Sequence, residues 1–251
     1  MGNFYLIPPL FFMIAFVFSM LGMGGGQLYV PILYWMGMDF KTQAVPLGML
    51  LNFVNTFSAT ITYARHRLIN WQVAIPFGLT MIVMAPVGTW LNVQLPVDLL
   101  LFILVLFTVA AAVLMLSGWK PSRGTLSARS RIILGLTAGS ALGLMAGLIG
   151  RGGGSFVVPL LYIAGLDPQA AAATSALVVT GSGLSSFVSH LATAAAPDWS
   201  VWGLSVVSVV IGSQLGSRVM STKLQPRRLK TVFAVVLLGV AGLLMRDVIL
   251  A

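Results

Sequence analysis

This 251-residue sequence has no cysteine, no glutamate and very little charge of either sign. Without cysteine, disulfides and thiolate metal ligands are both excluded. Charged residues make up 8% of the chain and hydrophobic residues 58%, whereas soluble domains carry roughly 25% charged residues. A water-facing surface cannot be built from this composition, so the chain belongs in a lipid bilayer.

The acidic residues are five aspartates, and all lie near the ends of apolar segments. No carboxylate is therefore expected in mid-membrane, which argues against a cation carrier and against a proton relay built on buried acids. A membrane-embedded enzyme would need a nucleophile or an acid–base pair there, so we expect no enzyme and no cofactor or metal site. Asp39 and Asp167 each precede an apolar segment, and Pro168 follows the second, which predicts helix N-caps.

The net charge of +9 would suggest nucleic-acid binding in a soluble protein, but loop Lys and Arg also orient membrane helices. Apolar stretches near or above roughly 18 residues recur along almost the whole chain. They predict one all-α, polytopic transmembrane domain spanning 1–251. The N-terminal apolar run has no Lys or Arg before Lys41, so we interpret it as a first helix and not as a signal peptide.

An internal repeat organises the sequence. Leu21–Leu33 reads LGMGGGQLYVPIL and Ile149–Leu161 reads IGRGGGSFVVPLL, so the two copies stand at a constant offset of 128 in the numbering. From Gly22 to Asp39, 10 of 18 positions are identical at that offset. Shared glycines, proline, tyrosine and aspartate in one register exceed the chance similarity of two apolar segments. We expect two repeats, 1–119 and 129–251.

Each repeat divides at Gly, Pro and charged residues into five apolar segments. The second segment of each has only 11 residues, which at 1.5 Å per residue rises roughly 16 Å, about half of a bilayer core. The ten predicted segments are Asn3–Gly22, Gln27–Gly37, Lys41–Ala64, Asn70–Val93, Pro96–Trp119, Arg131–Gly150, Ser155–Gly165, Pro168–Thr193, Trp199–Val219 and Pro226–Ile249.

The basic residues indicate how the short segments run. If each long helix and its short successor form a hairpin that enters and leaves on one side, 11 of the 14 basic residues fall on one face. If the short segments lie on the surface, the same count is seven against seven. The positive-inside rule favours the hairpins. Five segments per repeat then give inverted repeats, a multi-pass protein of the inner (plasma) membrane, and both termini outside the cytoplasm.

The two glycine-rich tips are the predicted substrate site. Each precedes a short helix, whose N-terminus exposes unpaired N–H groups and a partial positive charge. Inverted repeats with short, Gly-interrupted segments at matching positions indicate a transporter's binding site. Candidate substrate-binding residues at the tips are Gly24, Gly25, Gly26, Gln27, Arg151, Gly152, Gly153, Gly154 and Ser155.

Arg151 stands in the second glycine run, where the hairpin places it deep in the membrane. Its planar fork suits the oxygens of a carboxylate, sulfonate or sulfite; alternatively it extends to the surface or pairs with backbone carbonyls. The glycines could serve close helix packing instead of binding. The third segments add Asn52, Asn55, Thr174, Ser175 and Thr180, which can donate to an anion or bond to neighbouring helices. His190 is predicted to be an interfacial polar residue, or else a proton-carrying one.

The duplicated Gly-x-Gly-Gly-Gly followed by Val-Pro, at Gly22–Pro31 and Gly150–Pro159, and the sequence Ala173-Thr174-Ser175 together resemble the TauE/SafE family. This family is also known as sulfite exporters or 4-toluene sulfonate uptake permeases. The resemblance covers nearly the whole chain and implies an inner-membrane transporter of sulfur-containing anions, driven by a coupling ion, either proton or sodium. Arg151 departs from the family's pattern, in which this position is more often small or apolar.

We therefore expect a secondary transporter of a small sulfur-containing anion, working by alternating access. An anion channel with the same site, or a transporter of another small organic anion, remains open. A structural subunit would not need two matched glycine-rich breaks.

Overall fold

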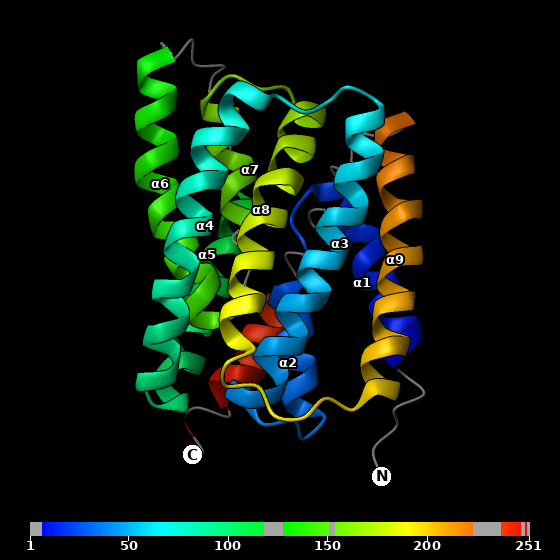
Figure 1. The fold of residues 1–251 in the computed structure, drawn as a ribbon, viewed down its shortest axis with the longest axis vertical. Coiled ribbons are helices and arrows are strands. Elements are labelled where there is room, and N and C mark those ends of the chain that lie inside the picture. The colour runs from blue at the N-terminus through cyan, green and yellow to red at the C-terminus, as the bar shows by residue number, and fades with distance from the viewer. Residues whose placement is uncertain (1–6, 118–127, 151–153, 223–236, 247–248, 250–251) are drawn as a thin grey trace.

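The computed structural model describes residues 7–117, 128–150, 154–222, 237–246 and 249. This part of the chain is all-helical, as predicted, and its long helices stand roughly side by side in one bundle (Figure 1). Six of the helices in it are long and apolar enough to cross a membrane. Their outward faces carry large apolar side chains such as Val83, which is 67% exposed. Such faces fit a lipid environment, so the protein is a multi-pass membrane protein.

The first half of the bundle begins with a hairpin of a long and a short helix, α1 (Ile7–Leu21) and α2 (Gly26–Trp35). A π-helical turn, η2 (Phe40–Ala44), leads into α3 (Val45–Arg65). Then follow α4 (Trp71–Gln94) and α5 (Val97–Leu116). The predicted segments agree with these helices to within a few residues, because Gly, Pro and charged residues stand at the breaks.

The second half has the same order of α-helices, without a counterpart of η2. A long helix, α6 (Ala128–Ile149), precedes the short α7 (Gly154–Ile163). The long α8 (Pro168–His190) and α9 (Trp199–Thr222) follow, and a last apolar helix spans Leu237–Arg246. The bounds of α7 and α9 coincide with those of α2 and α4 at the repeat offset, at both ends of each helix.

The predicted aspartate caps are confirmed. Asp167 accepts hydrogen bonds from the amides of Gln169 and Ala170, each at 3.0 Å, at the start of α8. Asp39 accepts from the Thr42 amide at 2.8 Å and from the Thr42 hydroxyl at 2.7 Å. The hydroxyl of Thr42 and then its amide lower the pKa of Asp39 below its ordinary value.

Helices from the two halves pack against one another and not only against their sequence neighbours. The most extensive contacts join α4 to α6 and α1 to α9, and α3 packs along α8. In Figure 1, α3 and α8 run in opposite directions at the centre of the bundle, and so do α4 and α9. A Cβ added to Gly88 would strike the carbonyl oxygen of Leu144, and one added to Gly216 would strike that of Phe16. Gly88 and Gly216 are equivalent positions of the repeat, and so are their contact partners Leu144 and Phe16.

Exposed arginines gather at one end of the bundle. Arg65, Arg67, Arg129 and Arg218 are exposed and lie at the ends of helices drawn at the top of Figure 1. We call this the arginine-rich end. The opposite end carries Asp39, Lys41, Asp98 and Asp198.

Candidate substrate site at the meeting of two glycine hairpins

Both hairpins turn at a position where most residues other than glycine would not be tolerated. Gly22 has a φ of +66° and Gly150 one of +67°, the left-handed conformation that costs L-residues with a Cβ. At the first turn the Gly22 amide donates to the Ser19 carbonyl at 3.1 Å, and the Met23 amide to the Phe18 carbonyl at 3.0 Å. These bonds close the C-terminus of α1 in the manner of a glycine C-cap and free the chain to reverse into α2.

The two hairpin tips meet inside the bundle. The Gln27 amide nitrogen donates to the Ser155 hydroxyl, and these two residues occupy equivalent positions of the repeat. Both side chains are buried, at 2% and 1% exposure. A Cβ on Gly154 would strike the Met23 backbone, so the tips touch at backbone distance. The structure thus brings the predicted Gln27, Gly154 and Ser155 together.

Two asparagines of α3 hold the first tip. The Asn52 side-chain oxygen accepts from the amides of Gly25 and Gly26 at 3.2 and 3.3 Å. The Asn55 side-chain nitrogen donates to the Gly24 carbonyl at 2.9 Å. Two of the helix-end amides expected to face a substrate are therefore already directed at Asn52. The atoms left to contact a ligand are the side-chain nitrogen of Asn52 and the side-chain oxygen of Asn55.

Three buried polar atoms at this tip have no hydrogen-bond partner among the described residues: Asn52 Nδ2, Asn55 Oδ1 and the Tyr29 hydroxyl. Tyr29 lies over Gly25, since a Cβ there would strike its ring. Asn52 Nδ2 faces Gly183 of α8. Unpaired buried polar groups are costly, and at a helix break they indicate a site built for a ligand. Tyr29 was not a sequence candidate, because nothing in an apolar stretch distinguishes it from a core aromatic residue.

The candidates on α8 divide into two groups. The Ser175 hydroxyl donates to the Gly22 carbonyl at 2.7 Å, and Thr180 lies 3.2 Å from the Thr60 hydroxyl across the α3–α8 contact. Both therefore border the first hairpin or the bundle centre. The Thr174 hydroxyl instead accepts from the Asn70 amide at 3.0 Å, which ties α8 to the start of α4. Arg151, Gly152 and Gly153 lie outside the described residues.

His190 is the last residue of α8, which agrees with its predicted position near the outer end of its segment, and its side chain is fully buried in the protein. Its Nε2 lies 2.9 Å from the Gly147 carbonyl oxygen near the end of α6. A position at the end of a helix usually implies exposure, so the burial of His190 could not be predicted from the sequence.

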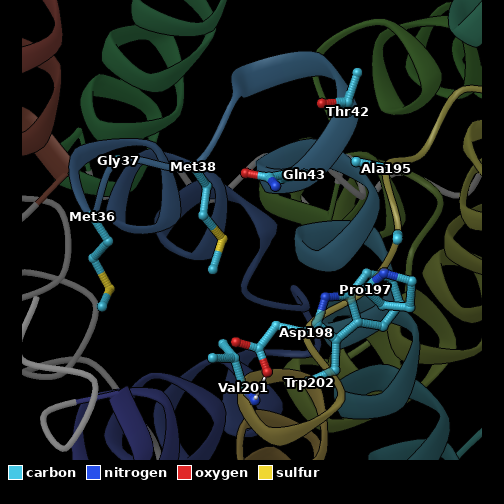
Figure 2. A pocket seen from close by; sticks show the side chains of 11 residues that line it. Met36, Gly37, Met38, Thr42, Gln43, Ala195, Pro197, Asp198, Val201 and Trp202 are labelled. Atoms are coloured by element: carbon cyan, nitrogen blue, oxygen red, sulfur yellow. Dashed lines mark hydrogen bonds between the residues drawn. The ribbon is translucent and has the colours of Figure 1, made fainter. Parts of the chain in front are cut away.

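A pocket of about 220 Å³ opens at the end opposite the arginine-rich end. Figure 2 shows that Met36, Met38 and Asp198 border it, between the α2–η2 connection and the loop before α9. The Ala195 amide donates to the Thr42 carbonyl at 2.9 Å and joins these two walls. The hydroxyl of Ser200 lowers the pKa of Asp198. The pocket lies beyond the C-terminus of α2, whose N-terminus is at the buried tips.

The described residues contain no group of three or more side chains suited to a metal ion. An apolar bundle with two broken-helix hairpins and buried polar groups at their meeting point is the architecture of a membrane transporter. The model of the sulfite exporter TauE/SafE family matches residues 7–244. The chain belongs to this family, as the resemblance of its glycine motifs indicated.

The relatives agree with this class. A probable membrane transporter protein of Methanocaldococcus jannaschii is 26% identical over 97% of both chains. Another from Sinorhizobium sp. is 29% identical over 97% of this chain and 94% of its own. A third, from Bacillus subtilis, is 22% identical over 94% of this chain and 95% of its own. No solved structure matches the chain significantly. The protein is a membrane transporter, which handles a small substrate within lipid.

Proposed function

We propose that the protein is a secondary transporter of small sulfur-containing anions, namely sulfite, an organosulfonate or a related carboxylate. The family's name concerns sulfite export, and the buried polar cluster at the hairpin tips is the observation that carries the proposal. Asn52 Nδ2 and the Tyr29 hydroxyl can each donate to an oxyanion. Both are buried and unpaired among the described residues.

The Gln27–Ser155 contact is the proposed closed form of the binding centre. A substrate oxygen inserted between these side chains can accept from the Gln27 amide and from the Ser155 hydroxyl, replacing one hydrogen bond by two. Arg151 is proposed as the positive counter-charge, since a guanidinium pairs with sulfite or sulfonate oxygens through two parallel bonds. The remaining predicted tip residues, Gly24–Gly26 and Gly152–Gly154, let the ligand approach the backbone.

Alternating access of two inverted repeats is the proposed mechanism. Three observations support it: the matched bounds of α2 with α7 and α4 with α9, the opposite directions of α3 and α8 and of α4 and α9 in Figure 1, and the paired close contacts at Gly88 and Gly216. Related halves of opposite direction can exchange conformations, which exposes a central site to each side in turn. The pocket of Figure 2 would then be the mouth of one path.

We propose that the arginine-rich end faces the cytoplasm, since Lys and Arg accumulate on that side of membrane proteins. The protein would then lie in the inner (plasma) membrane, with both termini outside the cytoplasm. A reporter fused to the C-terminus and active only in the cytoplasm should be inactive. Activity of that reporter would contradict the orientation.

Substrate binding can be tested by the thermal midpoint of the purified protein with sulfite, methanesulfonate, acetate and chloride. A ligand at 100 times its dissociation constant stabilises the folded state by about 2.7 kcal/mol. For a chain of this size that raises the midpoint by about 5–11 °C. Sulfite or methanesulfonate should do so, and Ser155→Ala and Arg151→Ala should reduce the shift. Ser140→Ala is the matched control, because Ser140 is only half-buried on α6 and bonds to its own helix at the Leu136 carbonyl.

If none of these anions shifts the midpoint, the sulfur-anion assignment fails. Flux in proteoliposomes separates a transporter from an anion channel. A transporter accumulates sulfite against its gradient when an ion gradient is supplied, whereas a channel only equilibrates it.

A further inference from the structure

Two side-chain hydrogen bonds join the ends of the long central helices to the hairpins. On α3, the Tyr63 hydroxyl donates to the Ser19 carbonyl at 2.7 Å. On α8, His190 Nε2 lies 2.9 Å from the Gly147 carbonyl oxygen. Ser19 and Gly147 occupy equivalent positions of the repeat, and each stands three residues before the glycine that turns its hairpin. The acceptors are therefore equivalent, one in each half, whereas the donors are one position apart, since Tyr63 corresponds to Leu191 and His190 to Thr62.

The two contacts lie toward opposite ends of the bundle. Tyr63 is near the end of α3 at the arginine-rich end, and His190 is the last residue of α8 at the other end (Figure 1). Each hydrogen bond joins a central helix, α3 or α8, to the C-terminal part of the long helix of a hairpin, α1 or α6. Any opening that separates α8 from α6 at its end must break the His190 contact, whereas the Tyr63 contact restrains the arginine-rich end.

The two hydrogen bonds, from Tyr63 and from His190, differ in chemistry. A tyrosine hydroxyl keeps its proton throughout the physiological range, whereas histidine is the side chain that changes charge between about pH 5 and about pH 8. When Nε2 donates to the Gly147 carbonyl, a neutral ring carries its lone pair on Nδ1. His190 Nδ1 is buried and has no hydrogen-bond partner among the described residues. A proton added there finds no acceptor while α8 and α6 remain packed.

The ionisable groups on the elements around His190 lie elsewhere. Helix α4 has none in its sequence, and α8 has no other, its N-cap Asp167 standing at the far end. On α3, α6 and α7 the ionisable residues are Tyr63, Arg65, Arg129, Arg131 and Tyr162, whose positions along these helices are toward the arginine-rich end. Near the His190 end are Asp39, Lys41 and Asp198 in the turns outside the bundle, Asp98 in the first turn of α5, and Arg246 at the end of the last helix.

Lys41 is engaged among these groups. Its ammonium donates to the carbonyls of Val93 and Leu95, at 3.1 and 2.5 Å, where α4 ends. Among the described residues, Asp39, Asp98 and Asp198 at this end are all exposed, so no buried carboxylate is there to pair with an imidazolium at His190. Water is the acceptor that a second ring proton requires.

We propose that His190 is a proton-binding site of the transport cycle, whose protonation releases α8 from α6 and opens that end of the bundle. The step is an acid–base reaction: a proton from water adds to the Nδ1 lone pair, and the imidazolium leaves the Gly147 carbonyl for solvent. This names the proton as the coupling ion of the proposed function and rests on it. Tyr63, with no such titration, keeps the other end independent of pH.

The absence of cysteine from the natural sequence permits a direct test without any substrate. Ser186→Cys places a thiol on α8, one turn before His190, where the native side chain is fully buried and its hydroxyl is 3.5 Å from the Ala146 carbonyl. Ala192→Cys provides an exposed thiol just beyond α8. The rate at which a charged methanethiosulfonate reagent labels Ser186→Cys is divided by the rate at which it labels Ala192→Cys. This ratio reports opening at the α8 end. Because both rates are measured with the same reagent, the ratio cancels the reagent's own pH dependence.

The ratio is measured from about pH 8 to about pH 5.5, the range in which histidine titrates, in sodium and in choline buffers. It should rise as the pH falls, by at most tenfold per pH unit because one proton is bound. His190→Gln keeps a donor for the Gly147 carbonyl but cannot titrate, so it should give a flat ratio. His66→Gln, which changes the exposed histidine in the turn after α3, should behave as the wild type.

A flat ratio with native His190 overturns the proposal, even if the His190 variant fails to fold. So does an unchanged pH dependence in His190→Gln, or a ratio that follows sodium and not pH. Because no anion is added, these outcomes are independent of the sulfite and methanesulfonate binding test.

Discussion

Replacing Asn52 with alanine should loosen the first hairpin more than any other single change in the polar cluster. Asn52 accepts from two buried amides, those of Gly25 and Gly26, and alanine leaves both without an acceptor. An unsatisfied buried group costs about 1–3 kcal/mol, so the pair costs about 2–6 kcal/mol. At about 2–4 °C per kcal/mol for a chain of this size, a mid-range loss of about 4 kcal/mol lowers the thermal midpoint by about 8–16 °C.

Asn55→Ala supplies the comparison within the same cluster. It orphans only the Gly24 carbonyl, so the loss should be about 1–3 kcal/mol, roughly half as large. Asn52→Asp keeps the acceptor oxygen and should retain more stability than Asn52→Ala. Midpoints are compared in one detergent, with Ser140→Ala as the reference for a substitution away from the site. A midpoint for Asn52→Ala equal to that of Ser140→Ala would refute the capping of the hairpin by Asn52.

Three further predictions concern packing and caps. Gly88→Ala should cost about 1–3 kcal/mol, because its Cβ overpacks the α4–α6 contact, whereas Gly203→Ala, with open space around it, should be neutral or stabilising in the same thermal assay. Asp167→Ala should cost about 0.5–2 kcal/mol through loss of the α8 cap, and Asp167→Asn should restore most of it. Since Thr42 lowers the pKa of Asp39, the stability from that cap is fully present above about pH 4, the unfolded value, and declines as the pH falls further. Acid titration of the midpoint should show a smaller decline in Asp39→Asn, and an identical decline would contradict the assignment.

Much of the fold could be predicted from the sequence because its signals are local. A composition so poor in charge permits only a lipid environment, and breaks at Gly, Pro and Asp placed the ends of most described helices within a few residues, although the last segment was predicted from Pro226 and the described helix begins at Leu237. Asp167 followed by Pro168 identified a helix start, since both residues act on the first turn alone. The recurrence of the glycine motif in the second half of the chain predicted the two short helices, because only a broken helix needs such a run.

The contacts of the candidate site depend on packing between distant segments. Gln27 meets Ser155 only because two hairpins enter one bundle and reach the same depth. Asn52 could have bonded to any neighbouring helix, and only the approach of α3 to the first tip directs its oxygen at the Gly25 and Gly26 amides. Tyr29 and His190 appeared apolar-core and interfacial from their positions in the chain. Their buried, unpaired atoms arise because the tertiary fold removes water from groups whose partners no local sequence rule can supply.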